Sequence, residues 1–380
     1  MKINYKKTYS FFMSALFIVF VGVMALANLI KKDEKFSDLE NRYLSEMPQV
    51  SVGGVVSREY SEKVESYISD QFPGRNIFVA MKGSMDSLSG KKDRNGVFIG
   101  KSGQLLQDFK ERSEEETTAK ISAVNEFAER YSDLNISFML IPTATKVLEN
   151  ELPKNAPVDD EKEYIDNFKG QLKESIKFID TYEALKSSKS EKLYFRTDHH
   201  WTSRGAYEGY KELCKTLELE AKSEENFEIK PVTERFYGSL SSQIASEQGE
   251  ADTIEVYFPK EGGETVVTYV EEQKKSPSLY DSSKLDDKDK YQVFTGGNHP
   301  RINIKSMGDP ERKLLLIKDS YANAMVPFLI FNYGEIEVID LRYFTEDLDK
   351  VIKSKGITDI LFLYNVNTFN EDDSILNLEM

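Results

Sequence analysis

A nearly continuous run of apolar residues lies near the N-terminus. Residues 11 to 30 are apolar or small apart from Ser14 and Asn28. A helix of that length, at about 1.5 Å per residue, crosses a hydrocarbon core of about 30 Å. We therefore predict a membrane segment within residues 1 to 32. Lysines flank it almost equally, so the positive-inside rule is nearly tied, and the large polar remainder favours a cytoplasmic N-terminus.

This segment allows two interpretations. Ala25-Leu26-Ala27 resembles a signal peptidase site, which would make the segment a cleaved signal. The apolar run continues through Leu29 and Ile30 beyond that site. We therefore favour an uncleaved single-pass anchor, with the rest of the chain extracytoplasmic.

After residue 110 the apolar spacing alternates between helix and strand periods. This alternation is typical of βαβ units and predicts an α/β domain over residues 111 to 380, preceded by a leader over residues 33 to 110. Between about 221 and 312 the pattern is irregular, and we predict a partly β insertion there. The predicted segments are helical faces at Ile121 to Tyr131, Ile165 to Ile176 and Ala206 to Cys214, strands at Ile136 to Ile141, Phe178 to Asp180, Leu314 to Ile317, Ile336 to Ile339 and Ile360 to Leu363, and a hairpin of Val256 to Phe258 with Val266 to Tyr269.

One predicted strand ends at a candidate nucleophile. The four apolar residues Leu314 to Ile317 predict a strand buried on both faces, as in a parallel sheet, and Asp319-Ser320 follows shortly after. Ligands bind beyond the carboxyl ends of such strands. Ser320 is therefore placed for nucleophilic attack, with backbone N–H groups of the next turn as an oxyanion site. The alternative is that Ser320 only caps a helix.

The chain contains 3 histidines, two of them adjacent in Asp198-His199-His200-Trp201. Imidazole titrates close to neutrality, so one ring could act as general base for Ser320 and be oriented by Asp198. Both histidines could instead hydrogen-bond inside a core. A metal site is a weaker alternative, because few further ligands besides carboxylates remain. We predict no metal and no cofactor.

Spacing favours His200 over His199 as the base. In an extended segment side chains alternate between two faces, so Asp198 and His200 would share one face while His199 and Trp201 share the other. His199 would then be free for packing or substrate contact. Trp201 could stack on sugar or form a wall of the site, and the alternative is a core residue. This argument requires the segment to be extended.

Two motifs, Asp198 to Trp201 and Lys318 to Asn323, together resemble the DHHW family, which is related to the SGNH-like proteins of alginate O-acetylation. The resemblance spans roughly residues 36 to 365. It implies an SGNH-like three-layer αβα sandwich with a mainly parallel sheet. Further matching segments are Glu40-Asn41-Arg42, Asp70 to Arg75, Asn95 to Gly100 and Gly296 to Pro300.

The resemblance also implies roles for individual residues, with Asp198 as orienter, His200 as base and Ser320 as nucleophile. The order Asp, His, Ser along the chain reverses the usual SGNH order, and Tyr321 stands where many relatives have Phe. Neither departure removes a required group. The implied partner is a multi-pass membrane-bound O-acyltransferase that supplies the acyl group.

An oxyanion hole needs two or three donors. The Ser320 N–H is the first candidate. Gly297 and Asn298 are the second, since glycine lets backbone approach a ligand and the Asn amide can donate, although Gly-Gly-Asn is also an ordinary turn. Arg342 is a candidate substrate contact whose alternative is a surface salt bridge. The remaining candidate contacts are Tyr321, Asn323, His199 and Trp201.

Charge and sulfur content narrow the class of protein. The chain has 65 acidic and 50 basic residues, a net charge of −15, which argues against a nucleic-acid partner because phosphates require a basic surface. One cysteine excludes an internal disulfide. Cys214 lies on an apolar helical face and is predicted to be a core residue.

These observations predict a membrane-anchored, extracytoplasmic O-acetyltransferase that acts on a cell-surface or exported polysaccharide through a Ser-His-Asp triad and an acyl-serine intermediate. Two alternatives remain. One is a carbohydrate acetylesterase with the same triad and water as acceptor. The other is a non-catalytic glycan-binding or assembly subunit, which the acidic, aromatic-rich composition permits.

Overall fold

The computed structural model describes residues 5–37, 42–49, 59–88, 93–188, 192–245 and 250–379. The chain forms two compact units. The smaller unit holds residues 1 to 91 and 242 to 246, and the larger unit holds residues 92 to 241 and 247 to 380. The predicted division after residues 32 and 110 stays a prediction.

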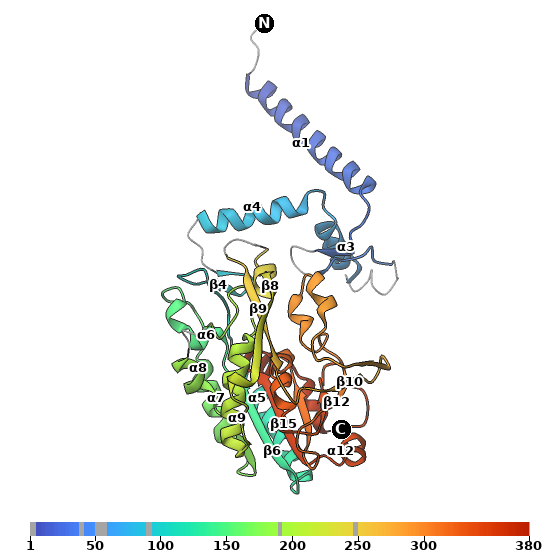
Figure 1. Cartoon of the computed structure of the whole chain (residues 1–380). Helices are drawn as coiled ribbons and strands as arrows, with labels where there is room; N and C mark the ends of the chain where they lie inside the picture. Colours follow the sequence, from blue (N-terminus) through green and yellow to red (C-terminus); the bar gives the residue numbers. More distant parts are fainter. Residues whose placement is uncertain are drawn as a thin grey trace. The chain divides into compact units, whose positions relative to one another are not determined.

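The smaller unit begins with the long apolar helix α1 (Tyr5–Ile30), at the place predicted for the membrane segment (Figure 1). By length and composition its residues Tyr5–Asn28 can cross a membrane, and a signal sequence near an N-terminus meets the same criteria. Glu40 and Asn41, part of one predicted motif, lie outside the described residues. The elements after α1 are β1 (Phe36–Ser37), β2 (Arg42–Tyr43), α3 (Glu59–Asp70) and α4 (Arg75–Leu88).

The larger unit is built on an eight-stranded sheet. The strands from β14 to β7 run parallel to one another, and β12, β10 and β11 add antiparallel pairs at one side. The prediction of a mainly parallel sheet is confirmed. In spatial order the strands are β11 (Lys274–Ser276), β10 (Val266–Tyr269), β12 (Arg301–Lys305), β14 (Glu335–Ile339), β13 (Lys313–Lys318), β15 (Asp359–Asn365), β6 (Asn135–Ile141) and β7 (Ile176–Phe178).

Helices cover both faces of this sheet and form three layers. The strand β13 contributes Leu314 and Leu316 to one apolar cluster and Leu315 and Ile317 to the other, because successive side chains point to opposite faces. The predicted three-layer α/β architecture is confirmed. On the first face lie α6 (Ala144–Val147), α8 (Tyr182–Ser187), α9 (Ser203–Leu217) and α11 (Val326–Leu329), and on the second lie α5 (Glu114–Arg130), α7 (Glu161–Gln171), α12 (Leu348–Lys355), α13 (Val366–Glu371) and η7 (Ser374–Glu379).

Smaller elements surround the main sheet. A three-stranded sheet joins β3 (Asp93–Arg94), β4 (Val97–Ile99) and β5 (Leu105–Gln107), and a two-stranded sheet joins β8 (Phe227–Phe236) and β9 (Asp252–Pro259). The short helical turns are η1 (Glu149–Glu151), η3 (Glu224–Asn226), α10 (Ser239–Gln243), η4 (Ser282–Asp286), η5 (Lys290–Val293) and η6 (Ser320–Ala324).

Two sequence predictions about elements were wrong. The predicted hairpin does not form, because β9 pairs with β8 whereas β10 joins the edge of the main sheet. The second error concerns a boundary: α7 ends at Gln171, and Ile176, expected on its helical face, begins strand β7. The predicted strand Phe178 to Asp180 therefore shares only Phe178 with β7. In both cases the segment is apolar as expected, but the strand that it pairs with lies far away in sequence, and this strand determines the observed structure.

Candidate active site

Ser320 lies at the carboxyl end of the central strand β13, which has parallel neighbours on both sides. The strand ends at Lys318, and Asp319 caps the turn η6 by accepting a hydrogen bond from the Tyr321 N–H at 2.9 Å. The same buried carboxylate accepts the Asn365 N–H at 2.8 Å, which ties the turn to the end of β15. The predicted position of Ser320 at a strand end is confirmed, and the N-cap is Asp319.

The structure brings Asp198, His200 and Ser320 into a continuous row. The distance between Ser320 Oγ and His200 Nε2 is 2.7 Å, and the distance between His200 Nδ1 and Asp198 Oδ1 is 2.6 Å. Because an ionised carboxylate only accepts hydrogen bonds, the proton on this side of the ring lies on Nδ1. The Nε2 atom is then free to accept the hydroxyl proton of Ser320.

Asp198 is held by backbone donors as well as by the histidine. Its Oδ1 accepts the His200 N–H at 2.9 Å, and its Oδ2 accepts the Ser239 N–H at 2.7 Å. Residues 197 to 200 form bends and not an extended strand. The premise of alternating faces was therefore wrong, although the expected pairing of Asp198 with His200 is present. A tight turn achieves it by folding the carboxylate back onto the backbone and the ring.

Electrostatics favour an ionised Asp198. Burial raises the pKa of this carboxyl, but the charges of His200 and His199 and the hydrogen bonds to the carboxylate outweigh burial and leave the pKa far below its usual value. Asp198 is 2% exposed. A buried ionised carboxylate can stabilise a positive charge on the adjacent ring of His200, which is the state a general base passes through.

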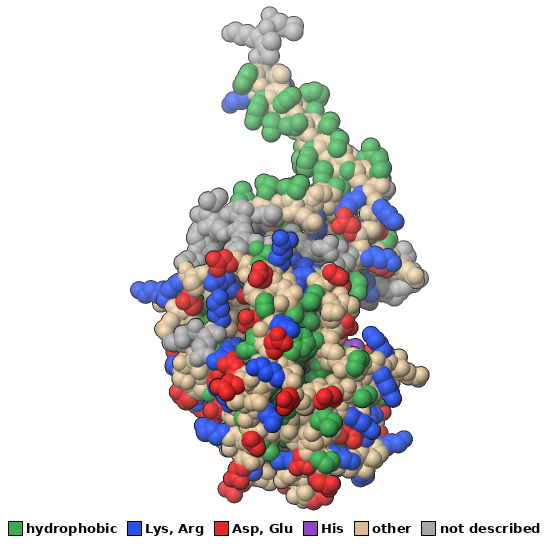
Figure 2. Space-filling model, viewed as in Figure 1, with side chains coloured by type: hydrophobic (Ala, Val, Ile, Leu, Met, Phe, Trp, Pro, Cys, Tyr) green, Lys and Arg blue, Asp and Glu red, His purple; other side chains and the backbone are tan. Residues whose placement is uncertain are grey.

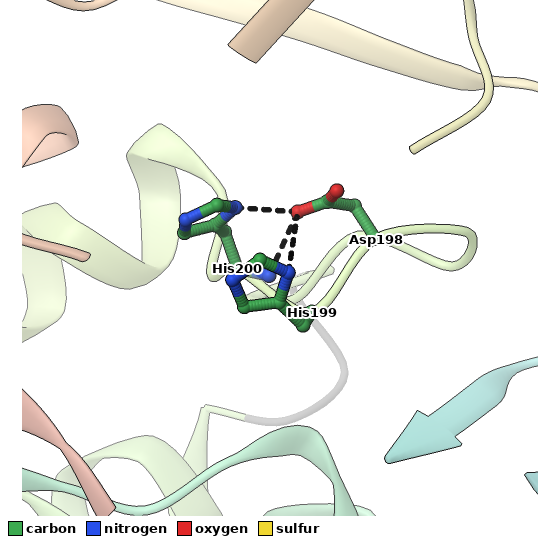
Figure 3. Close-up of side chains that lie close together, drawn as sticks. All are labelled: Asp198, His199 and His200. Atoms are coloured by element: carbon green, nitrogen blue, oxygen red, sulfur yellow. Dashed lines mark hydrogen bonds and ion pairs between the residues drawn. The ribbon is translucent and has the colours of Figure 1, made fainter. Parts of the chain in front are cut away.

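His199 has different partners from His200. Its Nδ1 lies 2.6 Å from Ser239 Oγ, and its ring centroid lies 3.8 Å from that of His200. Figure 3 shows the two rings beside the Asp198 carboxylate. Burial, together with the charge of His200, lowers the pKa of His199 to about 3, so the ring is neutral at pH 7. The side chain remains 28% exposed, which leaves part of the ring open to solvent.

Tyr291 is part of the site but was missed by sequence reasoning. Its ring stacks on His200 with centroids 3.7 Å apart and planes 7° apart, and its hydroxyl donates to the Ser320 carbonyl at 3.2 Å. Tyr291 thus supports the orientation of the His200 ring and the backbone of Ser320 at once. It is one of 20 tyrosines and lies in the turn η5, and no motif around it marks it.

Trp201 and Tyr321 are packed inside the protein. Trp201 is 0% exposed, and its Nε1 donates to the Tyr321 carbonyl at 2.8 Å. This corrects the sugar-stacking interpretation of Trp201, because a fully buried ring offers no face to a glycan. Tyr321 is equally buried and donates its hydroxyl to the His199 carbonyl. Both residues connect the two motifs through the core.

The candidate oxyanion donors differ in availability. The Gly297 N–H donates to the Phe294 carbonyl at 3.1 Å within its own turn, which does not favour it as a donor to substrate. Asn298 uses its Oδ1 to accept from Lys318 Nζ at 2.9 Å and from Asn323 Nδ2 at 3.1 Å. The Asn298 Nδ2 atom is not used in these two hydrogen bonds. In the described part of the chain no acceptor is found for the Ser320 N–H.

Arg342 belongs to a buried ion-pair network beside the site. Its guanidinium donates to both oxygens of Asp340, at 2.8 Å and 2.6 Å, and Lys318 Nζ lies 3.4 Å from the same carboxylate. The Arg342 side chain is 24% exposed. Arg342 therefore forms the salt bridge that was the alternative to a substrate contact, and part of its guanidinium is still open to solvent.

The three residues Asp198, His199 and His200 also place ligand atoms within 4.8 Å of one another, close enough to hold a metal ion. Three of the four ring nitrogens and both carboxylate oxygens take part in hydrogen bonds. An ion bound by all three residues would have to replace several of these bonds. The arrangement therefore fits a hydrogen-bonded row better than a metal centre.

Comparisons with known proteins identify the family of this chain. The model of the DHHW protein family matches residues 96–339. A DHHW family protein of Eubacterium siraeum is similar over 75% of this chain and 96% of its own, with 27% identity and a TM-score of 0.65. Bacillus cereus PatB1, solved with a sulfonyl adduct, is similar over 74% of this chain and 98% of its own, with 21% identity and a TM-score of 0.63.

A more distant similarity is to the O-acetyltransferase domain of Pseudomonas putida AlgJ, with 14% identity, a TM-score of 0.49 and coverage of 75% of this chain and 98% of that one. At this distance the similarity carries no argument about mechanism. None of the curated proteins matches the chain. The family model covers well over half of the chain and includes both motifs of the site. The chain therefore belongs to the DHHW family.

Proposed function

We propose that this chain is a membrane-anchored, extracytoplasmic O-acetyltransferase that transfers acetyl groups to hydroxyls of a cell-surface or exported polysaccharide. One observation carries the proposal: Asp198, His200 and Ser320 form a hydrogen-bonded row at the carboxyl end of a buried parallel strand. That arrangement is what nucleophilic catalysis by a serine requires.

The first half-reaction acylates the serine. Ser320 Oγ attacks the carbonyl carbon of an acetyl donor while His200 Nε2 takes its proton, and the carbonyl oxygen becomes an oxyanion. We assign the Ser320 N–H and the Asn298 amide as donors to that oxyanion. When the carbonyl re-forms, the bond to the leaving group breaks, His200 returns the proton to that group, and an acetyl ester remains on Ser320.

The second half-reaction releases the acetyl group to a sugar. His200 accepts the proton of an acceptor hydroxyl as its oxygen attacks the acetyl ester, and the collapse of the second tetrahedral intermediate returns that proton to Ser320 Oγ. Asp198 stabilises the imidazolium in both halves. Water in place of the sugar hydroxyl gives an acetylesterase, so the acceptor that reaches the ester decides between the two enzyme classes.

The donor and the location are inferred from the resemblance and from α1. A multi-pass membrane O-acyltransferase would supply the acyl group on the outer side of the membrane, and α1 would keep this chain beside it. The neutral ring of His199 and the open part of Arg342 are the proposed contacts for the sugar, because both remain partly exposed beside the row.

The test uses the full chain and its single-residue variants. Ser320→Ala and His200→Ala should each lower turnover of a small acetyl ester by about 10³-fold or more, and the double variant should be little worse than either, because triad members act as one unit. Ser187→Ala, at an exposed serine of α8, is the matched control. His199→Ala should cost far less than His200→Ala, and equal losses would contradict the assignment of the base.

Two further measurements distinguish the enzyme classes from a binding subunit. A serine-directed sulfonyl fluoride should label Ser320 in the wild type and leave His200→Ala unlabelled. A sulfonyl adduct is present in the structure of PatB1. Mass spectrometry of the polysaccharide from cells with wild type or Ser320→Ala should then show acetylation only with the wild type. Ester release without glycan acetylation would favour the esterase, and neither activity would favour a binder.

A further inference from the structure

Outside α1, exposed large apolar side chains concentrate in the smaller unit. Among the described residues, those of the larger unit lie singly and far apart in the sequence: Ile229, Val266, Met307 and Tyr343. Isolated residues of this kind are ordinary on a protein surface. In the smaller unit the exposed residues after α1 fall within a short stretch: Tyr43, Met47, Ile68, Ile77, Phe78, Met81 and Met85.

Four of these side chains form one face of α4. Ile77, Phe78, Met81 and Met85 are 65%, 49%, 51% and 65% exposed, and at 100° per residue they lie within an arc of about 100°. Figure 2 shows the hydrophobic side chains along α4. Lys82, which is also exposed, lies outside this arc. The helix is thus amphipathic, with its apolar face uncovered.

Hydrogen bonds place the start of α4 close to the end of α1. The side chain of Gln71 accepts from the Glu34 N–H at 3.0 Å and donates to the Glu34 carbonyl at 2.9 Å. Glu34 lies four residues after Ile30, the last residue of α1. Arg75, the first residue of α4, forms an ion pair of 3.6 Å with Asp70. If α1 spans a membrane, α4 begins at the membrane surface.

We propose that α4 lies in the interface of the phospholipid bilayer, with Ile77, Phe78, Met81 and Met85 inserted among the lipid headgroups and upper acyl chains. This inference rests on the membrane anchor of the proposed function. An amphipathic helix in this position inserts its apolar face by about 5–10 Å. Lipid is the occupant that the structure favours, because the start of α4 is tied to the chain that leaves the membrane.

The test places an environment-sensitive fluorophore on single cysteines of the full chain. The buried Cys214 is first replaced by serine, and Met81→Cys, Met307→Cys and Phe17→Cys are then labelled separately. Met307 is 70% exposed in the larger unit and serves as the matched control for an exposed methionine, and Phe17 reports on α1. The proteins are reconstituted in vesicles of phosphatidylcholine and phosphatidylglycerol with or without spin-labelled lipid.

Lipid-facing labels should show blue-shifted emission and lose fluorescence to the spin-labelled lipid. We expect this loss at positions 81 and 17 and not at position 307. Loss at position 17 without loss at position 81 would overturn the proposal while leaving the anchor intact, and this result would also be expected if α4 binds a protein partner. Absence of loss at both positions would overturn the anchor and the proposal together, whatever the esterase activity of the preparation.

A second labelling site tests whether the fluorophore at position 81 itself causes the helix to insert. With the fluorophore on Met85→Cys, the substitutions Ile77→Asp and Met81→Asp should abolish the lipid-dependent loss, because the charged side chains withdraw the helix from the interface. Loss at position 17 should remain. Unchanged loss at position 85 in this variant would contradict insertion through the apolar face.

Discussion

Two adjacent histidines of this chain have different partners and therefore different chemistry. His200 lies between an ionised carboxylate and a serine hydroxyl, whereas His199 contacts Ser239 and keeps an open edge. The contrast arises from a turn that folds Asp198 back onto His200. Residue identity supplies the groups, and one turn of backbone determines which imidazole lies between the carboxylate and the serine hydroxyl.

The orienting role of Asp198 can be tested against metal binding. Asp198→Asn should lower turnover by about 10⁴-fold, because an amide stabilises the wrong tautomer of His200. Activity of the wild type should survive exhaustive dialysis against a chelator, measured as turnover of an acetyl ester. Loss of activity in the chelator with recovery on addition of zinc would mean that the three residues bind a metal.

The lowered pKa of His199 makes stability depend on pH. Its pKa is about 3 in the folded chain, against 6.5 for an unperturbed histidine. Between these two pH values His199 is protonated in the unfolded chain and neutral in the folded chain. The stabilisation is complete above pH 6.5 and is lost as the pH falls toward 3. For one proton the slope is at most about 1.4 kcal/mol per pH unit.

The measurement is the free energy of unfolding against pH for wild type and His199→Asn, in which the amide can still contact Ser239. The variant should lose less stability between pH 6.5 and 3 than the wild type. Burial raises the pKa of Glu161 to about 7, which acts in the opposite direction, so the prediction concerns the difference between the two proteins. Identical slopes would contradict a neutral His199.

At the scale of elements, turns at the carboxyl ends of strands and short helices assemble the site. The turn η6 presents Ser320, the bend before α9 presents Asp198 and His200, and η5 stacks Tyr291 on the His200 ring. A further turn before α10 closes over Asp198. At Gly238 an added Cβ would overlap the Asp198 side chain, so the turn can approach the carboxylate only with glycine there.

Gly238→Ala should therefore disturb catalysis more than folding. Pushing Asp198 away loosens the orientation of His200, and a displacement of about 1 Å in a catalytic group costs on the order of 10²-fold. The check is kcat for an acetyl ester together with the melting temperature. Gly170→Ala is the matched control, because a Cβ there meets nothing within 4 Å and alanine favours a helix. Equal activity of both variants would contradict the packing argument.

At the scale of the whole molecule, the chain combines an apolar N-terminal helix with an acidic larger unit. The net charge of −15 for the whole chain argues against a nucleic-acid partner, and α1 supplies the only described helix that by length and composition can cross a membrane. A retained anchor would confine catalysis to a surface and limit which acceptors can reach Ser320. Retention of α1 is therefore part of the proposed function.

Retention predicts that the protein isolated from membranes still begins before residue 25. N-terminal peptide mapping of the membrane and soluble fractions is the measurement. The apolar run continues beyond Ala27 through Leu29 and Ile30, which disfavours cleavage there. A new N-terminus at Asn28, with the protein in the soluble fraction, would show that the segment is a cleaved signal.

Local patterns in the sequence determined much of this fold. The apolar run of α1 and the buried strands β6, β13, β14 and β15 follow from the spacing of apolar residues, because such signals act within a few residues of chain. The motifs also contained Asp198, His200 and Ser320, so the chemical groups of the candidate site could be read from the sequence.

Only the tertiary structure decided how distant segments meet. Four observations show this: β9 pairs with β8, Trp201 is buried, Tyr291 stacks on His200, and Gly238 approaches Asp198. All of them depend on contacts between residues that are far apart in sequence. Each depends on the packing of the whole molecule, which favours one partner among many with the same local pattern. Sequence therefore determined the chemical groups and several helices and strands of the core, and packing determined their contacts.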